Sequence, residues 1–353
     1  MIRFTLPLLL FLLSGCAGLQ LTLKNASVQK PSNVALYFSV ETKNNLPVPG
    51  LDADMFHIYE DGQLISPYES KQTILNPEVS VAHFTVLLMD LSGSITESGT
   101  LPSLIEAASL FADRITKNQQ IAVYGFDGGA KLIPVVAPTS DAAVVRKGLK
   151  ALENYKVRDP STNLNGAVVE AVHVLQGLMD HAKQPMRFGT LVLFTDGTDR
   201  AHRVSDADMF ETLHNADLNV FAIGMGGEIS PRELQRLSTV GYLQADDLEQ
   251  IGFAFDDVAE LIEETSRKFY LLSYCSPSRA GHHTLEIEAF DEKLSGRLEH
   301  EFDATGFGPG CDPGQKPTFK AARVTTGKFA KSEKSGDLST ATASTKKSAS
   351  LNE

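Results

Sequence analysis

Three short polar segments of the chain carry the side chains that could bind a metal ion. Asp90, Ser92 and Ser94 form a D-x-S-x-S motif, Thr162 lies in a Ser-Thr-Asn segment, and Asp196 lies in a Thr-Asp-Gly segment. Together they offer two carboxylates and three hydroxyls, an oxygen-only set of the kind that hard cations prefer. The set predicts a Mg²⁺ site. Mn²⁺ accepts the same oxygens, and Ca²⁺ is a weaker alternative because calcium loops normally offer several direct carboxylates.

The segments around these residues alternate between strand and helix patterns. Residues 81–89 are apolar nearly throughout, as expected of a strand buried on both faces of a parallel sheet. A helical spacing of apolar residues follows over 101–115. The same alternation then continues, with strands at 120–126, 131–136, 188–195 and 218–224 and helices at 140–152, 165–179, 205–215, 231–239 and 247–267. This order predicts an α/β fold, a doubly wound and mostly parallel sheet over residues 80–267.

The predicted fold brings the three polar segments together at one site. In open α/β sheets the ligand site lies at the carboxyl ends of the strands. Asp90 ends the strand at 81–89, Asp196 ends the strand at 188–195, and Thr162 lies just before a helix. We therefore expect all three segments to meet at one edge of the sheet. The alternative is that they are ordinary turn and capping residues, which Asp, Ser and Thr often are.

With these motifs in their order, residues 80–267 resemble a von Willebrand factor A-type domain with a metal-ion-dependent adhesion site. In that family the serines that correspond to Ser92 and Ser94 ligate the metal directly. The threonine that matches Thr162 ligates directly or through water, and the aspartates that match Asp90 and Asp196 act mainly through water and the serine hydroxyls.

The resemblance implies a protein-binding function. Neutral direct ligands leave the cation under-neutralised with an open coordination position, which a Glu or Asp of a partner protein completes. We therefore expect an adhesion or complex-assembly module whose specificity comes from the surrounding loops at 127–130, 157–160 and 199–203. A metal site without an acidic protein ligand and a purely structural envelope scaffold are the non-enzymatic alternatives.

A Mg²⁺-dependent hydrolase is the enzymatic alternative. The haloacid-dehalogenase pattern would require a second Asp where this chain has Ser92. The chain also contains neither a G-x-S-x-G elbow nor an H-E-x-x-H pair. We therefore expect no enzymatic activity and no small-molecule substrate.

The segments on either side of the α/β region have strand patterns. Residues 32–78 contain period-two alternation and an Asp-Gly turn, and residues 268–314 contain three short alternating segments, at 269–274, 283–289 and 298–302. The C-terminal strands either form a sandwich alone or pair with 32–78. Pairing is favoured because neither half is large, which predicts a small β-sandwich-like domain that flanks the α/β region.

The N-terminus has the pattern of an export signal. Residues 1–15 combine a basic start, an apolar core and small residues, and the Leu-Ser-Gly-Cys run that ends at Cys16 resembles the bacterial lipobox. The resemblance implies lipidation of Cys16 and a polar tether over 16–31. Ala17 follows instead of the Asp that marks inner-membrane retention, so we expect a lipid-anchored protein of the bacterial cell envelope, at the outer membrane.

Two further cysteines, Cys275 and Cys311, form an even pair in a protein expected to be exported, which makes them a candidate disulfide. Two unrelated thiols are the alternative. No Cys/His cluster with zinc spacing is present in the sequence.

Charge is unevenly distributed along the chain. The formal net charge is −12, but residues 316–353 carry a net +5, which leaves −17 on the rest. Such an acidic body is a poor binder of polyanions, so nucleic acid is not an expected partner. Residues 315–353 are rich in Ser, Thr and Lys without apolar periodicity and are predicted to be a disordered tail.

Overall fold

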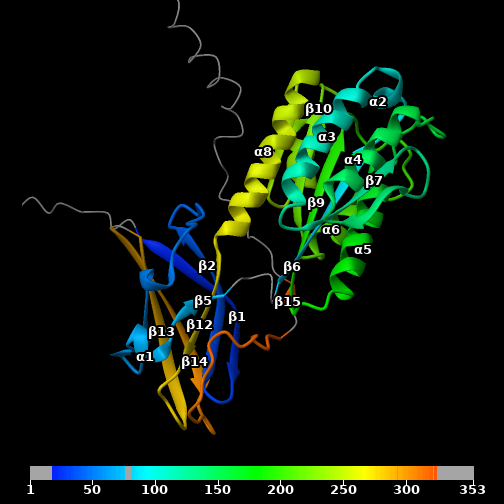
Figure 1. Cartoon of the computed structure of the whole chain (residues 1–353). Helices are drawn as coiled ribbons and strands as arrows, with labels where there is room; N and C mark the ends of the chain where they lie inside the picture. Colours follow the sequence, from blue (N-terminus) through cyan, green and yellow to red (C-terminus); the bar gives the residue numbers. More distant parts are fainter. Residues whose placement is uncertain (1–17, 76–80, 292, 321, 324–353) are drawn as a thin grey trace, which may run out of the picture.

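The computed structural model describes residues 18–75, 81–291, 293–320 and 322–323 (Figure 1). The predicted signal segment 1–15, Cys16 and residues 324–353 of the predicted tail lie outside the described residues. Among the helices of the described part, none is both long and apolar enough to cross a bilayer.

The central sheet has the strand order β11-β10-β9-β6-β7-β8, with a short strand β15 beside the start of β9. Its strands are β6 (Val81–Asp90), β7 (Gln120–Phe126), β8 (Ile133–Thr139), β9 (Met186–Thr195), β10 (Asn219–Met225), β11 (Gly241–Ala245) and β15 (Ala322–Arg323). β8 pairs with β7 in the antiparallel sense, and the other pairs are parallel. The predicted doubly wound, mostly parallel sheet is confirmed.

Helices cover both faces of this sheet. They are α2 (Gly93–Glu97), α3 (Leu101–Ile115), α4 (Ala142–Ala151), the 3-10 turn η3 (Leu152–Asn154), α5 (Leu164–Asp180), α6 (Asp206–His214), α7 (Pro231–Leu237) and α8 (Leu248–Arg267). Leu87 and Met89 of β6 pack in the cluster that contains α3, α4 and α8. Val86 and Leu88 pack in the cluster that contains α5, α6 and α7. This burial on both faces explains the continuous apolar run of β6.

β11 was not predicted from the sequence. Its five residues, Gly-Tyr-Leu-Gln-Ala, form the edge of the sheet, and four of them are only partly buried. An edge strand pairs with only one neighbour and has partly exposed side chains, so its sequence contains no continuous apolar run. The sequence pattern of this segment is therefore that of a loop between helices.

Two antiparallel sheets form the second part of the molecule (Figure 1). One has the order β1-β2-β12-β5, from β1 (Leu19–Gln29), β2 (Asn33–Thr42), β12 (Phe269–Cys275) and β5 (Thr73–Ile74). The other has the order β14-β13-β3-β4, from β14 (Leu294–Asp303), β13 (His282–Asp291), β3 (Phe56–Glu60) and β4 (Gln63–Leu64). Two short turns, η1 (Ala53–Met55) and α1 (Pro67–Ser70), lie between strands. Leu36, Phe56, Ile58 and Leu285 belong to the apolar cluster that both sheets share.

Strand pairing joins the N-terminal and C-terminal segments. β12 pairs with β2, and β13 pairs with β3, both in the antiparallel sense. Of the two arrangements left open by the sequence, the structure therefore has the one in which the C-terminal strands pair with residues before the α/β region.

The predicted tether over 16–31 is wrong for most of its length, because residues 19–29 form β1 and pair with β2. β1 is an edge strand with few buried side chains, Leu19 and Leu21 among them. Its largely polar composition therefore resembles that of a linker.

The predicted disordered tail also begins too early. Phe319 is buried in a cluster with Tyr37 and Phe269, and Asn25 Nδ2 donates a hydrogen bond to the Lys320 carbonyl at 2.8 Å. β15 then pairs with the start of β9. Phe319 is the buried apolar residue of this segment, and its neighbours in the sequence are polar. A single apolar residue produces no hydrophobic periodicity, so the sequence pattern did not predict an ordered segment here.

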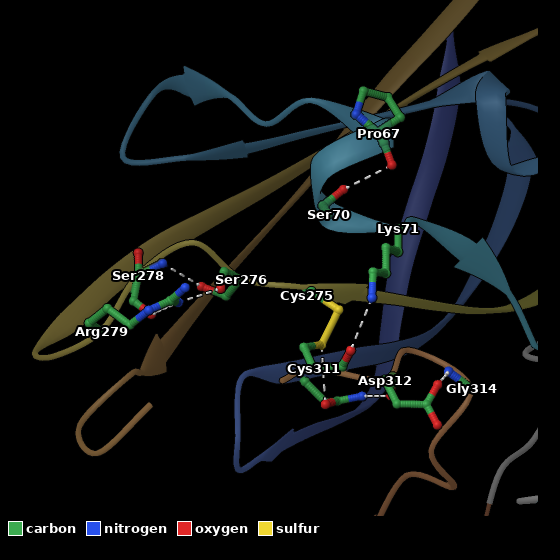
Figure 2. Close-up of a disulfide and its surroundings, with 11 residues drawn as sticks. Pro67, Ser70, Lys71, Cys275, Ser276, Ser278, Arg279, Cys311, Asp312 and Gly314 are labelled. Carbon is green, nitrogen blue, oxygen red and sulfur yellow. Dashed lines mark hydrogen bonds between the residues drawn. A yellow bond between two sulfur atoms is a disulfide. The ribbon is translucent and has the colours of Figure 1, made fainter. Parts of the chain in front are cut away.

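The disulfide between Cys275 and Cys311 is present, with the two Cα atoms 5.7 Å apart (Figure 2). It links the end of β12 to the segment that follows β14. The prediction from the even cysteine pair is confirmed.

Candidate metal centre

Asp90 ends β6 and is fully buried. Its Oδ1 accepts a hydrogen bond from the Ser92 amide at 2.9 Å, and its Oδ2 accepts one from Thr195 Oγ1 at 2.8 Å. Thr195 lies at the end of β9, which pairs with β6 in the parallel sense, so both strands end at the same edge. The carboxylate is therefore fixed by its own loop and by the neighbouring strand.

The two serines of the motif extend this network. Ser92 Oγ lies 3.2 Å from Ser94 Oγ, and Ser94 Oγ donates to Asp196 Oδ1 at 3.0 Å. Gly93 between them donates its amide to the Pro160 carbonyl at 3.0 Å, and a Cβ at this position would lie 3.0 Å from the Pro160 Cβ. A side chain at this position would force Pro160 to shift by a few tenths of an ångström, so glycine favours the close approach of the loop before α5 to the motif.

Thr162 lies in that loop and is buried, 4% exposed. Its carbonyl accepts the amides of Arg200 and Ala201, each at 2.9 Å, from the loop that follows Asp196. The structure thus brings four of the predicted residues into one hydrogen-bonded chain, Asp90–Ser92–Ser94–Asp196. It joins Thr162 to them through backbone contacts of its loop.

Burial and like charge act on both carboxylates. The pKa of Asp90 is raised to about 6, chiefly by burial and also by the charge of Asp196, while hydrogen bonds from Ser92 and Thr195 act in the opposite direction. Burial, together with the charge of Glu228, also raises the pKa of Asp196, while the hydrogen bond from Ser94 lowers it. A divalent cation beside these two groups would favour their charged forms.

The spacing of the oxygens tests whether a cation fits. Ligands about 2.1 Å from Mg²⁺ at right angles to each other lie about 3.0 Å apart, and the separation rises to about 3.4 Å for the longer bonds of Ca²⁺. The distances of 3.2 Å between the serine oxygens and 3.0 Å from Ser94 to Asp196 are compatible with a shared divalent cation of either size, and they are also ordinary hydrogen-bond distances. In the described part of the chain no cluster of three or more His, Cys, Asp or Glu residues could hold a metal.

Thr195 was not predicted from the sequence as part of the site, and Asp127 was predicted only as part of the specificity loop at 127–130. Thr195 lies in the same Thr-Asp-Gly segment as Asp196 and orients Asp90. Asp127 follows β7 and is 4% exposed; its carboxylate accepts from the Gly129 amide at 2.7 Å and the Tyr155 hydroxyl at 2.9 Å. Its position directly after a buried strand is the signal that could have identified it.

The rim of the site carries charged pairs. Arg200 forms an ion pair with Glu228 at 2.6 Å, and Arg203 Nε donates to the Gly128 carbonyl at 2.7 Å. These residues come from the loops at 127–130 and 199–203 and from the end of β10, so they surround the edge at which Asp196 lies.

Comparison with known proteins finds a family model that matches part of the chain. Residues 85–198 match the family model of the von Willebrand factor type A domain, and the matched segment contains all five predicted ligand residues. None of the curated proteins matches the chain.

Three solved structures illustrate the likeness of fold. A von Willebrand factor type A protein from Catenulispora acidiphila has 12% identity and a TM-score of 0.45, covering 83% of this chain and 75% of that one. The vWF domain of the type V pili tip protein Mfa5 from Porphyromonas gingivalis has 13% identity and a TM-score of 0.41, covering 52% and 96%. Manganese-loaded TRAP from Plasmodium vivax has 14% identity and a TM-score of 0.43, covering 71% and 99%.

The strand order, the helices on both faces and the family match together define the class. The chain has a von Willebrand factor A-like α/β fold, and two antiparallel sheets flank it.

Proposed function

We propose that this protein is an envelope-anchored, divalent-metal-dependent protein-binding module. The observation that carries the proposal is the hydrogen-bonded chain Asp90–Ser92–Ser94–Asp196 at the carboxyl edge of the sheet. Its oxygens lie close enough together to share a divalent cation such as Mg²⁺ or Mn²⁺, and its position is the one at which open α/β sheets bind ligands.

Each residue has a distinct task in this proposal. Ser92, Ser94 and Thr162 offer neutral hydroxyl oxygens as ligands. Asp196 accepts from Ser94, and Asp90 holds the Ser92 amide and Thr195, so the carboxylates orient the ligands. When bound, the cation supplies a positive centre that attracts an acidic side chain. Because the hydroxyl ligands carry no charge, a Glu or Asp of the partner completes the shell.

Charged side chains surround the site at its rim. The side chain of Arg200 is 63% exposed and pairs with Glu228, and that of Arg203 is 44% exposed and pairs with Asp159. Because each arginine already faces an acid, the bound cation supplies the main attraction for a partner carboxylate in this proposal.

The location in the cell is part of the proposal. The Cys16 lipobox implies a lipid anchor at the outer membrane, and the Cys275–Cys311 disulfide is typical of proteins in an oxidising compartment such as the bacterial periplasm. The chain would therefore present its metal edge to a protein of the envelope or of another cell surface.

The alternative of a hydrolase has less support. General acid–base catalysis requires a titratable group within hydrogen-bond reach of the reacting atoms. Within the described residues, no His or Lys side chain hydrogen bonds to Asp90, Ser92, Ser94 or Asp196; their side-chain partners are hydroxyls and one another. This arrangement suits binding rather than proton transfer.

Calorimetric titration of the full-length chain with Mg²⁺ and Mn²⁺ tests the proposal. We expect saturable binding at one site, weakened at least about tenfold by Ser94→Ala, which is about 1.4 kcal/mol of binding free energy. Ser98→Ala is the matched control, because Ser98 lies in the next turn and bonds only to Ile95 and Thr100. Equal metal affinity of the parent and Ser94→Ala would refute the metal site.

A further inference from the structure

A cavity lies in the flanking sheets, and none of the residues that line it belongs to the metal centre. Its volume is about 420 Å³, within the range of small-ligand sites. Four segments form its wall: the β1–β2 turn, the β4–α1 region, the end of β12 and the loop that contains Cys311. The lining includes Leu64, Ser70, Lys71, Ser276, Arg279 and Pro309.

Covalent and buried polar contacts fix the wall of this cavity. The Cys275–Cys311 disulfide holds the loop at 309–311 against the end of β12 (Figure 2). Behind the wall, the buried carboxylate of Glu60 accepts hydrogen bonds from the Tyr274 hydroxyl at 2.9 Å and from Ser278 Oγ at 2.6 Å. The turn after β12 is therefore held from two sides, and the cavity is preformed.

Two cations line the cavity. Lys71 Nζ contacts the Cys311 carbonyl at 3.5 Å, and Arg279 Nη1 donates to the Ser276 and Ser278 carbonyls at 2.9 Å each. In Figure 2 the two side chains lie on opposite sides of the disulfide. Among the described residues, neither forms an ion pair with a carboxylate.

The charge that lines the cavity is positive, whereas the protein as a whole is acidic. The chain carries 44 acidic against 32 basic residues, but Glu69 is the one acid among the residues that line the cavity. Arg279 uses Nη1 for both of its contacts with backbone carbonyls, so Nε and Nη2 remain as donors toward a ligand. An acidic chain that places two unpaired cations in one cavity offers a local site for negative charge.

The backbone at Lys71 supports the same conclusion. This residue has φ of 52° in the left-handed region, which costs about 1 kcal/mol for a residue with a side chain. Its left-handed conformation ends α1 and places Lys71 at the wall of the cavity. The floor adds buried hydroxyls, since Ser32, Ser70 and Ser276 are each 2% exposed.

We propose that this cavity binds a small organic anion with negatively charged groups at both ends, of the dicarboxylate class. Lys71 would contact one charged group, Arg279 would contact the other, and the serine hydroxyls and the apolar side chains would surround the body of the ligand. The site is separate from the metal centre and does not depend on its function.

Ligand-observed NMR titration of the full-length chain with succinate, glutarate and adipate tests this proposal. Passing the protein and every buffer over a chelating resin removes any contribution of a cation at the metal centre without adding a soluble polycarboxylate that could compete for the cavity. We expect one of the three to bind with a Kd of about 1 mM or tighter, which is about −4 kcal/mol, and its neutral diamide to bind at least tenfold more weakly.

Three variants test the assignment. Lys71→Asn removes the charge but tolerates the left-handed backbone, and Arg279→Gln keeps an amide donor; each should weaken binding at least about tenfold. Glu69→Gln removes the lining acid and should strengthen it. Lys150→Gln, on α4, is the control that should leave the affinity unchanged.

The outcomes are separable. Failure of all three dicarboxylates to bind at about 10 mM, where a site of about −3 kcal/mol would be half occupied, would overturn the proposal. So would equal affinity in the parent, Lys71→Asn and Arg279→Gln. Circular dichroism of each variant establishes that a loss of binding does not arise from a loss of fold.

Discussion

Asp90→Asn should stabilise the metal-free protein and abolish its response to Mg²⁺. The pKa of Asp90 rises from 3.8 to about 6 on folding, chiefly because the carboxyl is buried. At about 1.36 kcal/mol per pH unit, this difference means that the charged carboxylate costs about 3 kcal/mol of unfolding free energy at pH 7 in the absence of a cation. Asparagine removes the charge and keeps an oxygen for the Ser92 amide.

The amide nitrogen of the variant also finds a partner. Thr195 Oγ1 now donates to Asp90 Oδ2 and lies 3.0 Å from the Gly197 carbonyl. In the variant it can donate to that carbonyl and accept from the asparagine. We therefore expect a gain of about 2–3 kcal/mol in EDTA at pH 7, most of the electrostatic cost, with little change in packing.

The pH dependence gives the sign of the effect. A carboxyl whose pKa is raised by folding stabilises the folded state below its unfolded pKa of 3.8, and this contribution is lost as the pH rises through about 6. The difference between Asp90→Asn and the parent in EDTA should thus be small below pH 4 and reach its full value above pH 6. Mg²⁺ at a hundredfold excess over its Kd should add about 2.7 kcal/mol to the parent alone.

Urea unfolding in EDTA and in saturating Mg²⁺, at several pH values, measures all of these quantities. Asp127→Asn is the matched control, since Asp127 is buried at the same edge but its carboxylate accepts the Gly129 amide and the Tyr155 hydroxyl. It should gain no stability. The reasoning fails if Asp90→Asn is less stable than the parent in EDTA at pH 7, or if Mg²⁺ stabilises both equally.

Two further perturbations test the structure away from the site. Burial lowers the pKa of His83 from 6.5 to about 4. The neutral, buried imidazole therefore stabilises the folded state above pH 6.5, and up to about 3 kcal/mol of this stabilisation is lost as the pH falls toward 4. His83→Gln should flatten the pH profile of urea unfolding in this window, and an unchanged profile would contradict the assignment. The disulfide closes a loop with a sequence separation of 36 residues. The double variant Cys275→Ser with Cys311→Ser should therefore lose about 3–4 kcal/mol of unfolding free energy. If the double variant unfolds thermally at the same midpoint as the parent, the crosslink does not stabilise the fold.

The site residues were predictable because their chemistry and their place in the chain coincide. Asp90 and Asp196 each follow a strand that is apolar on both faces, and parallel strands bring such ends to one edge. The contact between Gly93 and Pro160 was not predictable, because it depends on how closely two loops approach. The role of Thr195 likewise depends on the pairing of β6 with β9, which periodicity does not specify.

The segments whose structure was not predicted from the sequence share a physical property. β1, β11 and the segment around Phe319 lie at sheet edges or between the two parts of the molecule, where few side chains are buried. Such segments derive their order from backbone pairing and from single apolar contacts. The periodicity of hydrophobic residues reports burial of a whole face, so it detects β6 and misses these edges.

The position of β6 has a mechanical consequence. It begins at Val81, which packs with Phe269 at the end nearest the flanking sheets, and it ends at Asp90. A pull on a partner bound at the metal edge would therefore run along β6, and through Asp196 along β9 as well, toward the rest of the chain. β6 pairs with β7 on one side and β9 on the other, so the pull would load both ladders in shear, with many hydrogen bonds sharing the force instead of breaking in turn.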